Sequence, residues 1–163
     1  MTLAQPRVEH PSTAPLTARH HPLIADFLAT TAGLGGRKFA ADSRDVAEQL
    51  DGTYPGSAVV LLGESGAVLG YAALHRPDGA EPEVLADFVF HPEAPGDAVA
   101  RIVADTVERF QRVAIPGSYL RTYIGADQPV AITALRRHGA RQERQFISTR
   151  KSLLDEDPVD LAA

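Results

Sequence analysis

The clearest alternation of hydrophobic and polar residues lies between residues 84 and 113. Residues 84–90 read VLADFVF, an apolar run that is typical of a buried strand. A turn-rich loop follows over residues 91–97. From Ala98 we predict a helix, because its apolar residues recur at steps of three and four: Val99, Ile102, Val103, Val107, Phe110 and Val113. A loop that opens into a helix presents free backbone N–H groups and the positive end of the helix dipole, so this pattern predicts an anion site.

Two further helices are predicted before this segment. The first covers residues 22–31, and its apolar face is formed by Leu23, Ile24, Phe27 and Leu28. The glycines within residues 33–36 end this helix. They could also be read as a phosphate loop, but such a loop follows a strand and ends in Lys-Ser or Lys-Thr. The second helix is capped by Asp42 or Ser43 and runs to Leu50.

The remaining elements are predicted to be strands and one alanine-rich helix. Residues 57–62 and 67–75 are β-rich runs around a Glu-Ser-Gly turn, which indicates a hairpin. After the central helix, strands are predicted at residues 119–124 and 146–153. A short edge strand near residues 7–10 is the most that the proline-rich N-terminal segment supports.

The composition narrows the class of protein. The chain has 163 residues, of which 44% are hydrophobic and 23% charged, as in one globular domain. No apolar run approaches the roughly 20 residues that span a bilayer, and the N-terminal residues lack the apolar core of a secretion signal. We therefore expect a soluble, cytoplasmic protein without a membrane partner. The absence of cysteine excludes disulfides, a thiol nucleophile and Cys-based zinc sites.

Charge and histidine content add little to this class. Four carboxylates in residues 154–163 supply most of the net charge of −5, so the body is close to neutral. Basic residues gather in the last third of the chain, where they could contact a phosphate or RNA, but no nucleic-acid motif accompanies them and we expect a solvated surface. His10, His20 and His21 lack a carboxylate at metal-ligand spacing, so we predict no metal site.

Residues 89–103, VFHPEAPGDAVARIV, resemble the acyl-CoA-binding segment of the GNAT superfamily of N-acyltransferases. Members of that superfamily share Arg or Gln, two residues, Gly, one residue, and Gly or Ala, and the backbone amides of this pattern hold the cofactor pyrophosphate. Residues 95–100 lie on it, with Ala100 at its last position and with Pro95 and Ala98 as departures. The resemblance implies that the cofactor contacts these residues: Val89, Phe90, His91, Gly96, Asp97, Ala98, Val99 and Ala100.

A second resemblance lies in residues 125–153. Superfamily members show an Asn, an Ala-rich helix, a Tyr and a Gly-Phe step before a final strand. Asp127 stands at the Asn position and is implied to contact the cofactor, whereas Leu135 replaces the Tyr. The resemblance covers residues 23–153 and implies an α/β, GNAT-like fold, with a mixed central sheet and helices on both faces. Residues 1–22 would form a Pro/His-rich N-terminal segment and residues 154–163 an acidic tail.

The residues also suggest which groups would move protons. Asp87 is our candidate base, because it lies inside an apolar strand, where burial raises the pKa of a carboxyl group. A solvated strand face or an arginine pair is the other reading, and Glu83 is the reserve base. With Leu135 at the Tyr position, Tyr123 could protonate the departing thiolate; a cross-strand aromatic contact is its other reading.

The sequence therefore predicts an N-acyltransferase that moves an acetyl or similar acyl group from acyl-CoA to an amine of a small molecule or peptide. Acetyl-CoA would be the donor. We expect Asp97 to cap the helix and to oppose the cofactor phosphates, which weakens binding. The alternative is a catalytically impaired GNAT-like module for binding or assembly, which could be a homodimer. Pro95, Asp97, Ala98 and Leu135 favour that alternative.

Overall fold

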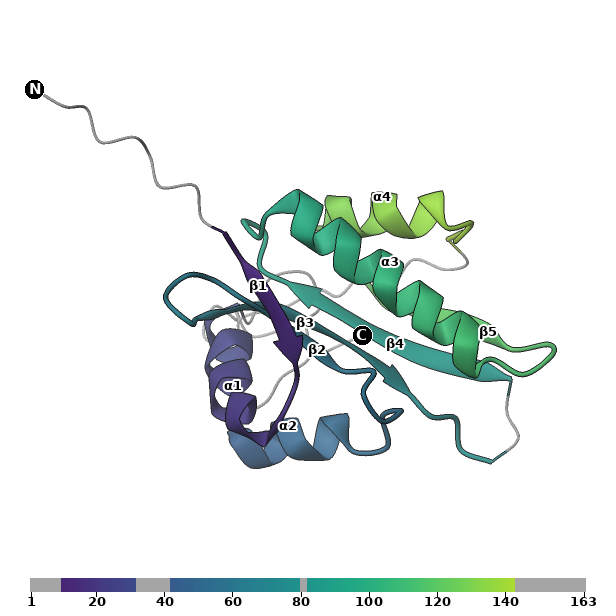
Figure 1. Cartoon of the computed structure of the whole chain (residues 1–163), viewed down its shortest axis with the longest axis horizontal. Coiled ribbons are helices and arrows are strands. Elements are labelled where there is room, and N and C mark those ends of the chain that lie inside the picture. Colours follow the sequence, from purple (N-terminus) through teal and green to yellow (C-terminus); the bar gives the residue numbers. More distant parts are fainter. Residues whose placement is uncertain (1–9, 32–41, 80–81, 143–163) are drawn as a thin grey trace, which may run out of the picture.

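The computed structural model describes residues 10–31, 42–79 and 82–142. Their helices and strands are, in chain order, β1 (Ser12–Pro15), η1 (Ala18–His20, a 3₁₀ turn), α1 (His21–Thr30), α2 (Ser43–Leu50), β2 (Val59–Leu62), β3 (Val68–His75), β4 (Glu83–Phe90), α3 (Gly96–Val113), β5 (Tyr119–Thr122) and α4 (Pro129–Arg137). Figure 1 shows α1 and α2 on one face of the sheet and α3 and α4 on the other. The predicted α/β class with helices on both faces is confirmed.

The sheet of the described residues has five strands in the order β1-β2-β3-β4-β5. Neighbours are antiparallel except for β4 and β5, which run parallel and are joined by α3. The central position of β4 explains its apolar sequence, since both of its faces are covered. The β2–β3 hairpin forms at the predicted turn, where the Gly63 N–H donates to the Ala67 carbonyl over 2.9 Å and Gly66 has φ 79°.

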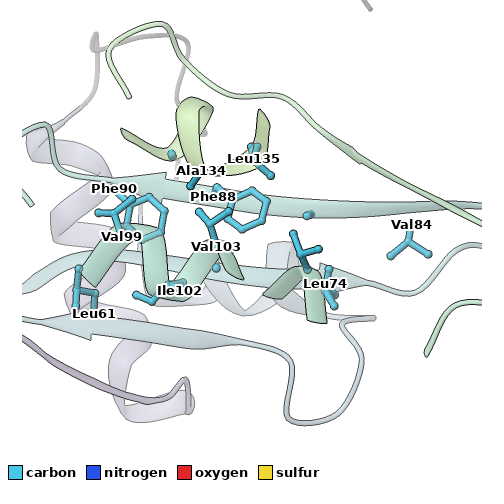
Figure 2. Packing of buried hydrophobic residues seen from close by; sticks show 14 residues of the cluster. Leu61, Leu74, Val84, Phe88, Phe90, Val99, Ile102, Val103, Ala134 and Leu135 are labelled. Carbon is cyan, nitrogen blue, oxygen red and sulfur yellow. The ribbon is translucent and has the colours of Figure 1, made fainter. Parts of the chain in front are cut away.

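Two hydrophobic clusters lie on opposite faces of the sheet. Phe88 and Phe90 of β4 point into the first, which also contains the buried face of α3 and part of α4. Figure 2 shows these phenyl rings against Val99, Ile102 and Val103. Val89 points the other way, into a cluster with α1 and α2. Alternation along one strand therefore supplies both cores.

The local signals at helix starts are borne out at α2 but not at α3. The Asp42 side chain accepts from the backbone N–H groups of Arg44 and Asp45 over 2.9 and 3.1 Å, as predicted for a cap. Helix α3 begins at Gly96, two residues earlier than expected, and Pro95 is its N-cap. The expected cap by Asp97 is wrong, because this residue lies inside the first turn and no side chain caps the helix.

Other boundaries differ from expectation by a few residues. The edge strand is Ser12–Pro15, after the predicted 7–10, and β5 ends at Thr122 instead of residue 124. The glycine-rich run at 33–36, the last predicted strand and the acidic tail lie outside the described residues. In the described part of the chain, no helix combines the length and apolar character that a membrane crossing requires.

Candidate functional site

Strands β4 and β5 separate halfway along β4. Their parallel register runs from the pair Glu83 and Tyr119 to the pair Ala86 and Thr122. Residues 87–90 of β4 extend beyond it, although they stay paired with β3 on their other side. Backbone groups at this end of β4 therefore face a gap instead of a neighbouring strand.

The side chain of Gln128 reaches into this gap. Its Oε1 accepts a 2.6 Å hydrogen bond from the Phe90 N–H, and its Nε2 donates to the Phe88 carbonyl over 3.3 Å. The residue is 7% exposed and forms the N-cap position of α4. The resemblance implied a cofactor contact for the neighbouring Asp127 and did not single out Gln128. The available signal was a polar residue directly before Pro129, which opens α4.

The start of α3 lies close to this end of β4. The Val99 N–H donates to the Pro95 carbonyl over 3.1 Å, which is the first helical bond. The preceding amides, those of Gly96, Asp97 and Ala98, have no partner within a helix turn and receive no side-chain cap. Asp97 is exposed. The predicted backbone groups are therefore presented at a helix N-terminus, where an anion is stabilised.

A hollow of about 440 Å³ lies between the start of α3 and the length of α4. It is lined by Gly96, Asp97, Ala100, Pro129, Val130, Thr133, Ala134 and Arg137. Gly96 faces Val130 across the two helices, and a Cβ added at Gly96 would make an ordinary 3.5 Å contact with a Val130 methyl group. Asp97 and Arg137 bring opposite charges to the hollow, and sequence reasoning did not single out Arg137 from the other basic residues.

Asp87 is the first residue of β4 beyond the paired segment. Its side chain is on the α1/α2 face of the sheet, and only 9% of the residue is exposed. Its Oδ2 lies 2.7 Å from Nε2 of His75 on β3. A solvated face does not describe this arrangement, since the carboxylate is buried beside the imidazole of the neighbouring strand.

The other candidates are spread around this centre. Tyr123 follows β5 and is 67% exposed. Glu83, the reserve base, accepts from the Tyr119 hydroxyl over 3.1 Å and pairs with Arg121 at 2.7 Å. Leu135 is buried against the sheet, so the family Tyr position contributes to the core here. Within the described ranges no group of three or more metal-ligating side chains is found.

The predicted cofactor residues thus fall into two groups. Val89, Phe90 and His91 lie at the end of β4, and residues 96–100 form the first turns of α3 beside the hollow. The His91 N–H donates to the Leu69 carbonyl, and its Nδ1 accepts from the Glu93 N–H over 3.1 Å, which shapes the turn toward α3. The end of β4 and the start of α3 are therefore joined by the short loop of residues 91–95.

No protein-family model matches the sequence, and no curated protein matches it. Solved structures do. A GCN5-related N-acetyltransferase from Sphaerobacter thermophilus is 18% identical with a TM-score of 0.59, over 80% of this chain and 43% of that one. A phosphinothricin acetyltransferase from Sinorhizobium meliloti, solved with acetyl-CoA, is 20% identical with a TM-score of 0.58, over 79% and 74%.

A ribosomal-protein-alanine N-acetyltransferase from Brucella melitensis is 18% identical with a TM-score of 0.54, over 78% of this chain and 83% of that one. The chain spans less than half of the Sphaerobacter protein and about three quarters or more of the other two. At these identities the likeness concerns the fold. The chain therefore has the fold of the GNAT superfamily of N-acyltransferases.

Proposed function

We propose that the protein transfers an acetyl group from acetyl-CoA to an amine of a small molecule or peptide. One observation carries this proposal: the gap beyond Ala86 and Thr122 opens next to an uncapped helix start. A ligand that has an extended arm with amide groups and a phosphate group at one end fits these features, because the arm would lie in the gap and the phosphate at the helix start. The Sinorhizobium enzyme with the same fold was solved with acetyl-CoA, which supports the choice of donor.

The residues at the two ends of the site fit different parts of this donor. The edge of β4 from Phe88 to His91 offers backbone groups to the pantetheine arm. The free amides of Gly96, Asp97 and Ala98 would hold the pyrophosphate, and the Arg137 guanidinium would add positive charge across the hollow. The Asp97 carboxylate opposes the same phosphates, so the charge of the site is balanced instead of strongly positive.

Acetyl-CoA supplies, when bound, an acetyl group on a thioester whose thiolate departs readily. The incoming ammonium must lose a proton before its nitrogen forms the new bond to carbon, and the carbon–sulfur bond then breaks. Asp87 accepts this proton, directly or through His75, because the pair lies where β4 leaves β5. Tyr123 follows β5 on the same face and its hydroxyl would protonate the thiolate. Backbone N–H groups at the end of β4 would stabilise the oxyanion.

A thermal-shift titration with acetyl-CoA, free CoA and longer acyl-CoAs tests the proposal. A ligand at one hundred times its Kd stabilises a folded protein by about 2.7 kcal/mol, which is readily measured as a rise in Tm. A thiol-release assay over a panel of primary amines then identifies the acceptor class. If none of the CoA compounds raises Tm at millimolar concentration, the transferase proposal is wrong.

A binding or assembly module on the same fold is the second candidate. It is favoured by the occupied edge of β4, where Gln128 already bonds to Phe88 and Phe90. The core position of Leu135 in place of a tyrosine also favours it. This candidate predicts CoA-independent stability and a self-association that analytical ultracentrifugation would detect. A rise in Tm with acetyl-CoA together with thiol release excludes it.

A further inference from the structure

The contact between Gln128 and β4 has the geometry of a strand pair. Residue 86 of β4 pairs with β5, and alternate residues point the same way, so the Phe88 carbonyl and the Phe90 N–H both face the gap. In a parallel ladder one residue donates to the carbonyl before its partner and accepts from the N–H after it. The Gln128 carboxamide does both, opposite Val89. It therefore supplies the N–H and the carbonyl that one residue of a missing strand would supply.

Two successive secondary amides on an extended ligand would need the same two groups. The N–H of a trans secondary amide points away from its own carbonyl, so one ligand amide would donate to the Phe88 carbonyl and the next would accept from the Phe90 N–H. A pantetheine arm lying along β4 carries two such amides. The two hydrogen bonds to Phe88 and Phe90 cannot be made to both partners at once, so binding exchanges the carboxamide for the ligand amides.

We propose that Gln128 occupies the pantetheine slot in the free protein and turns out of it when acyl-CoA binds, so that this side chain sets the cofactor affinity. The inference rests on the proposed function. It makes Gln128 a specificity-determining residue, because only a ligand that replaces both hydrogen bonds can displace it without leaving buried polar groups unpaired. Acyl-CoA compounds satisfy that condition, and free adenine nucleotides do not.

The surroundings allow the side chain to move while the backbone stays in place. The Gln128 N–H donates to the Gly125 carbonyl, and its own carbonyl accepts from the Ile132 N–H, each over 3.1 Å. These bonds fix the start of α4. The next residue, Pro129, opens α4 and lines the hollow of about 440 Å³ between α3 and α4.

The decisive experiment compares acetyl-CoA binding to the wild-type protein and to Gln128→Ala by calorimetry. The variant leaves the Phe88 and Phe90 groups without the Gln128 partner in the free protein, and the ligand amides then satisfy them without competition. We expect the Kd to fall about tenfold, the value that one hydrogen bond of ordinary net strength gives. The Tm of the free variant falls at the same time, and saturating acetyl-CoA restores it.

A matched variant separates this effect from general destabilisation. Val46→Ala removes buried side-chain volume from the α1/α2 cluster on the far face of the sheet and lowers Tm. Its Kd for acetyl-CoA should equal that of the wild type. If both variants tighten binding equally, the effect comes from loosening of the fold and the inference is overturned.

A second measurement uses the unmodified protein and does not depend on how the variant folds. In nuclear magnetic resonance spectra of the wild type, the Gln128 side-chain amide protons should exchange slowly because they are buried in the gap. Addition of acetyl-CoA should make them exchange rapidly while the Phe90 backbone amide stays protected. If the Gln128 side-chain amide protons still exchange slowly in the saturated complex, the side chain stays bonded to β4 and the inference is overturned.

The outcomes also separate this inference from the proposed function. If the wild type binds acetyl-CoA and Gln128→Ala binds equally or more weakly, the inference alone fails. If neither protein binds, both fail, because removal of the side chain should have opened the slot. Binding by the variant alone overturns both, because the Gln128 side chain of the wild type then keeps the slot closed instead of turning out of it.

Discussion

Asp97 is the acidic side chain at the proposed phosphate site. It is exposed in the first turn of α3 and lines the hollow opposite Arg137. At about 5 Å and an effective dielectric between about 80 and 20, its charge repels each phosphate charge by about 1 to 3 kcal/mol, whereas the helix dipole contributes about 0.3 to 1 kcal/mol of attraction. Repulsion therefore outweighs the dipole, and Asp97 weakens binding even though it does not cap the helix.

Asp97→Asn should consequently tighten acetyl-CoA binding by about tenfold or more at low salt, because about 1.4 kcal/mol corresponds to one decade in Kd. Calorimetry at two salt concentrations checks this, and the gain should shrink at high salt because the charges are exposed. Asp105→Asn is the control, since this exposed carboxylate lies about 12 Å further along α3. Equal affinities of wild type and Asp97→Asn would remove Asp97 from the explanation.

The pair of Asp87 and His75 is the proposed route for the proton of the incoming ammonium. Asp87→Asn removes the carboxylate but keeps its shape, so we expect turnover to fall by about 10²- to 10⁴-fold with little change in the Kd for acetyl-CoA. His75→Gln should give a smaller loss if the imidazole relays the proton. Thiol release measured across the pH range checks both. Glu83→Gln should keep its activity, and a large loss in this variant with full turnover of Asp87→Asn would move the base to Glu83.

His20 provides a pH dependence that is independent of the site. It is 3% exposed, and its Nδ1 accepts from the Thr17 N–H over 3.0 Å. Burial lowers the pKa of His20 below its ordinary 6.5, and the charge of Arg19 adds to this. The unfolded chain then binds the proton more readily, so stability is complete above about pH 6.5 and falls as the pH drops through the folded pKa.

We therefore expect Tm of the wild type to decrease more steeply between about pH 7 and pH 5 than Tm of His20→Gln, which has no charge to bury. Calorimetric scans at several pH values measure the slope. His10→Gln is the matched control because His10 is exposed. A slope that His20→Gln leaves unchanged would assign the acid sensitivity to other groups.

At the scale of elements, the close contact of β3 with β4 positions the end of β4 that borders the gap. Gly70 on β3 pairs with Phe90, and an added Cβ would lie 2.6 Å from the Val89 carbonyl and 2.9 Å from the Phe90 Cα. Both are backbone atoms, which cannot move aside as a flexible side chain can. Only glycine permits this approach, which gives a physical reason for the Gly before an aromatic residue in this strand.

Gly70→Ala should therefore destabilise the fold by about 1 to 3 kcal/mol or more, as overpacking of a core does. It should also weaken acetyl-CoA binding, because the end of β4 is displaced. Urea unfolding and calorimetry give the two numbers. Gly63→Ala is the matched control, since its Cβ would meet the Leu69 side chain at an ordinary 3.6 Å. Similar stabilities for the two variants would contradict the steric explanation.

The order of elements was predictable because it depends on short-range patterns. The strand at β4 and the helical spacing of α3 needed only their own residues, and the Asp42 cap needed only its neighbours. The start of α3 was not predicted correctly, because Pro95 opened the helix where an acidic cap was expected. Proline has no N–H to leave unpaired at that position, so it competes well with Asp97 for the boundary.

The candidate site was less predictable than the fold. The pair of Asp87 with His75 depends on the β3–β4 register, which places them diagonally across two strands. The contact of Gln128 joins residues 38 and 40 positions apart and depends on where α4 begins relative to the end of β4. The resemblance implied a cofactor contact for Asp127, whereas the next residue, Gln128, bonds to β4, and residue types alone do not predict which side chain of this loop enters the gap.

At the scale of the whole molecule, the sheet lies between two hydrophobic clusters, and each cluster supports a different part of the proposed site. The cluster with α3 and α4 supports the proposed cofactor end, since it fixes the two helix starts around the hollow. The cluster with α1 and α2 lies on the face that carries Asp87, where the acceptor would approach. Each face therefore has its own hydrophobic support, and β4 is the element they share.

Ile24→Ala and Ile102→Ala test this division with the same substitution on opposite faces. Both side chains are buried, one in each cluster, so each loss should cost about 2 to 5 kcal/mol in urea unfolding. Only Ile102→Ala should also weaken acetyl-CoA binding, because Ile102 holds the first turns of α3 against the sheet. Ile24→Ala should instead raise the KM for the acceptor amine and leave the Kd for acetyl-CoA unchanged. An equal loss of acetyl-CoA affinity in both variants would contradict this division, because both clusters would then support the cofactor end.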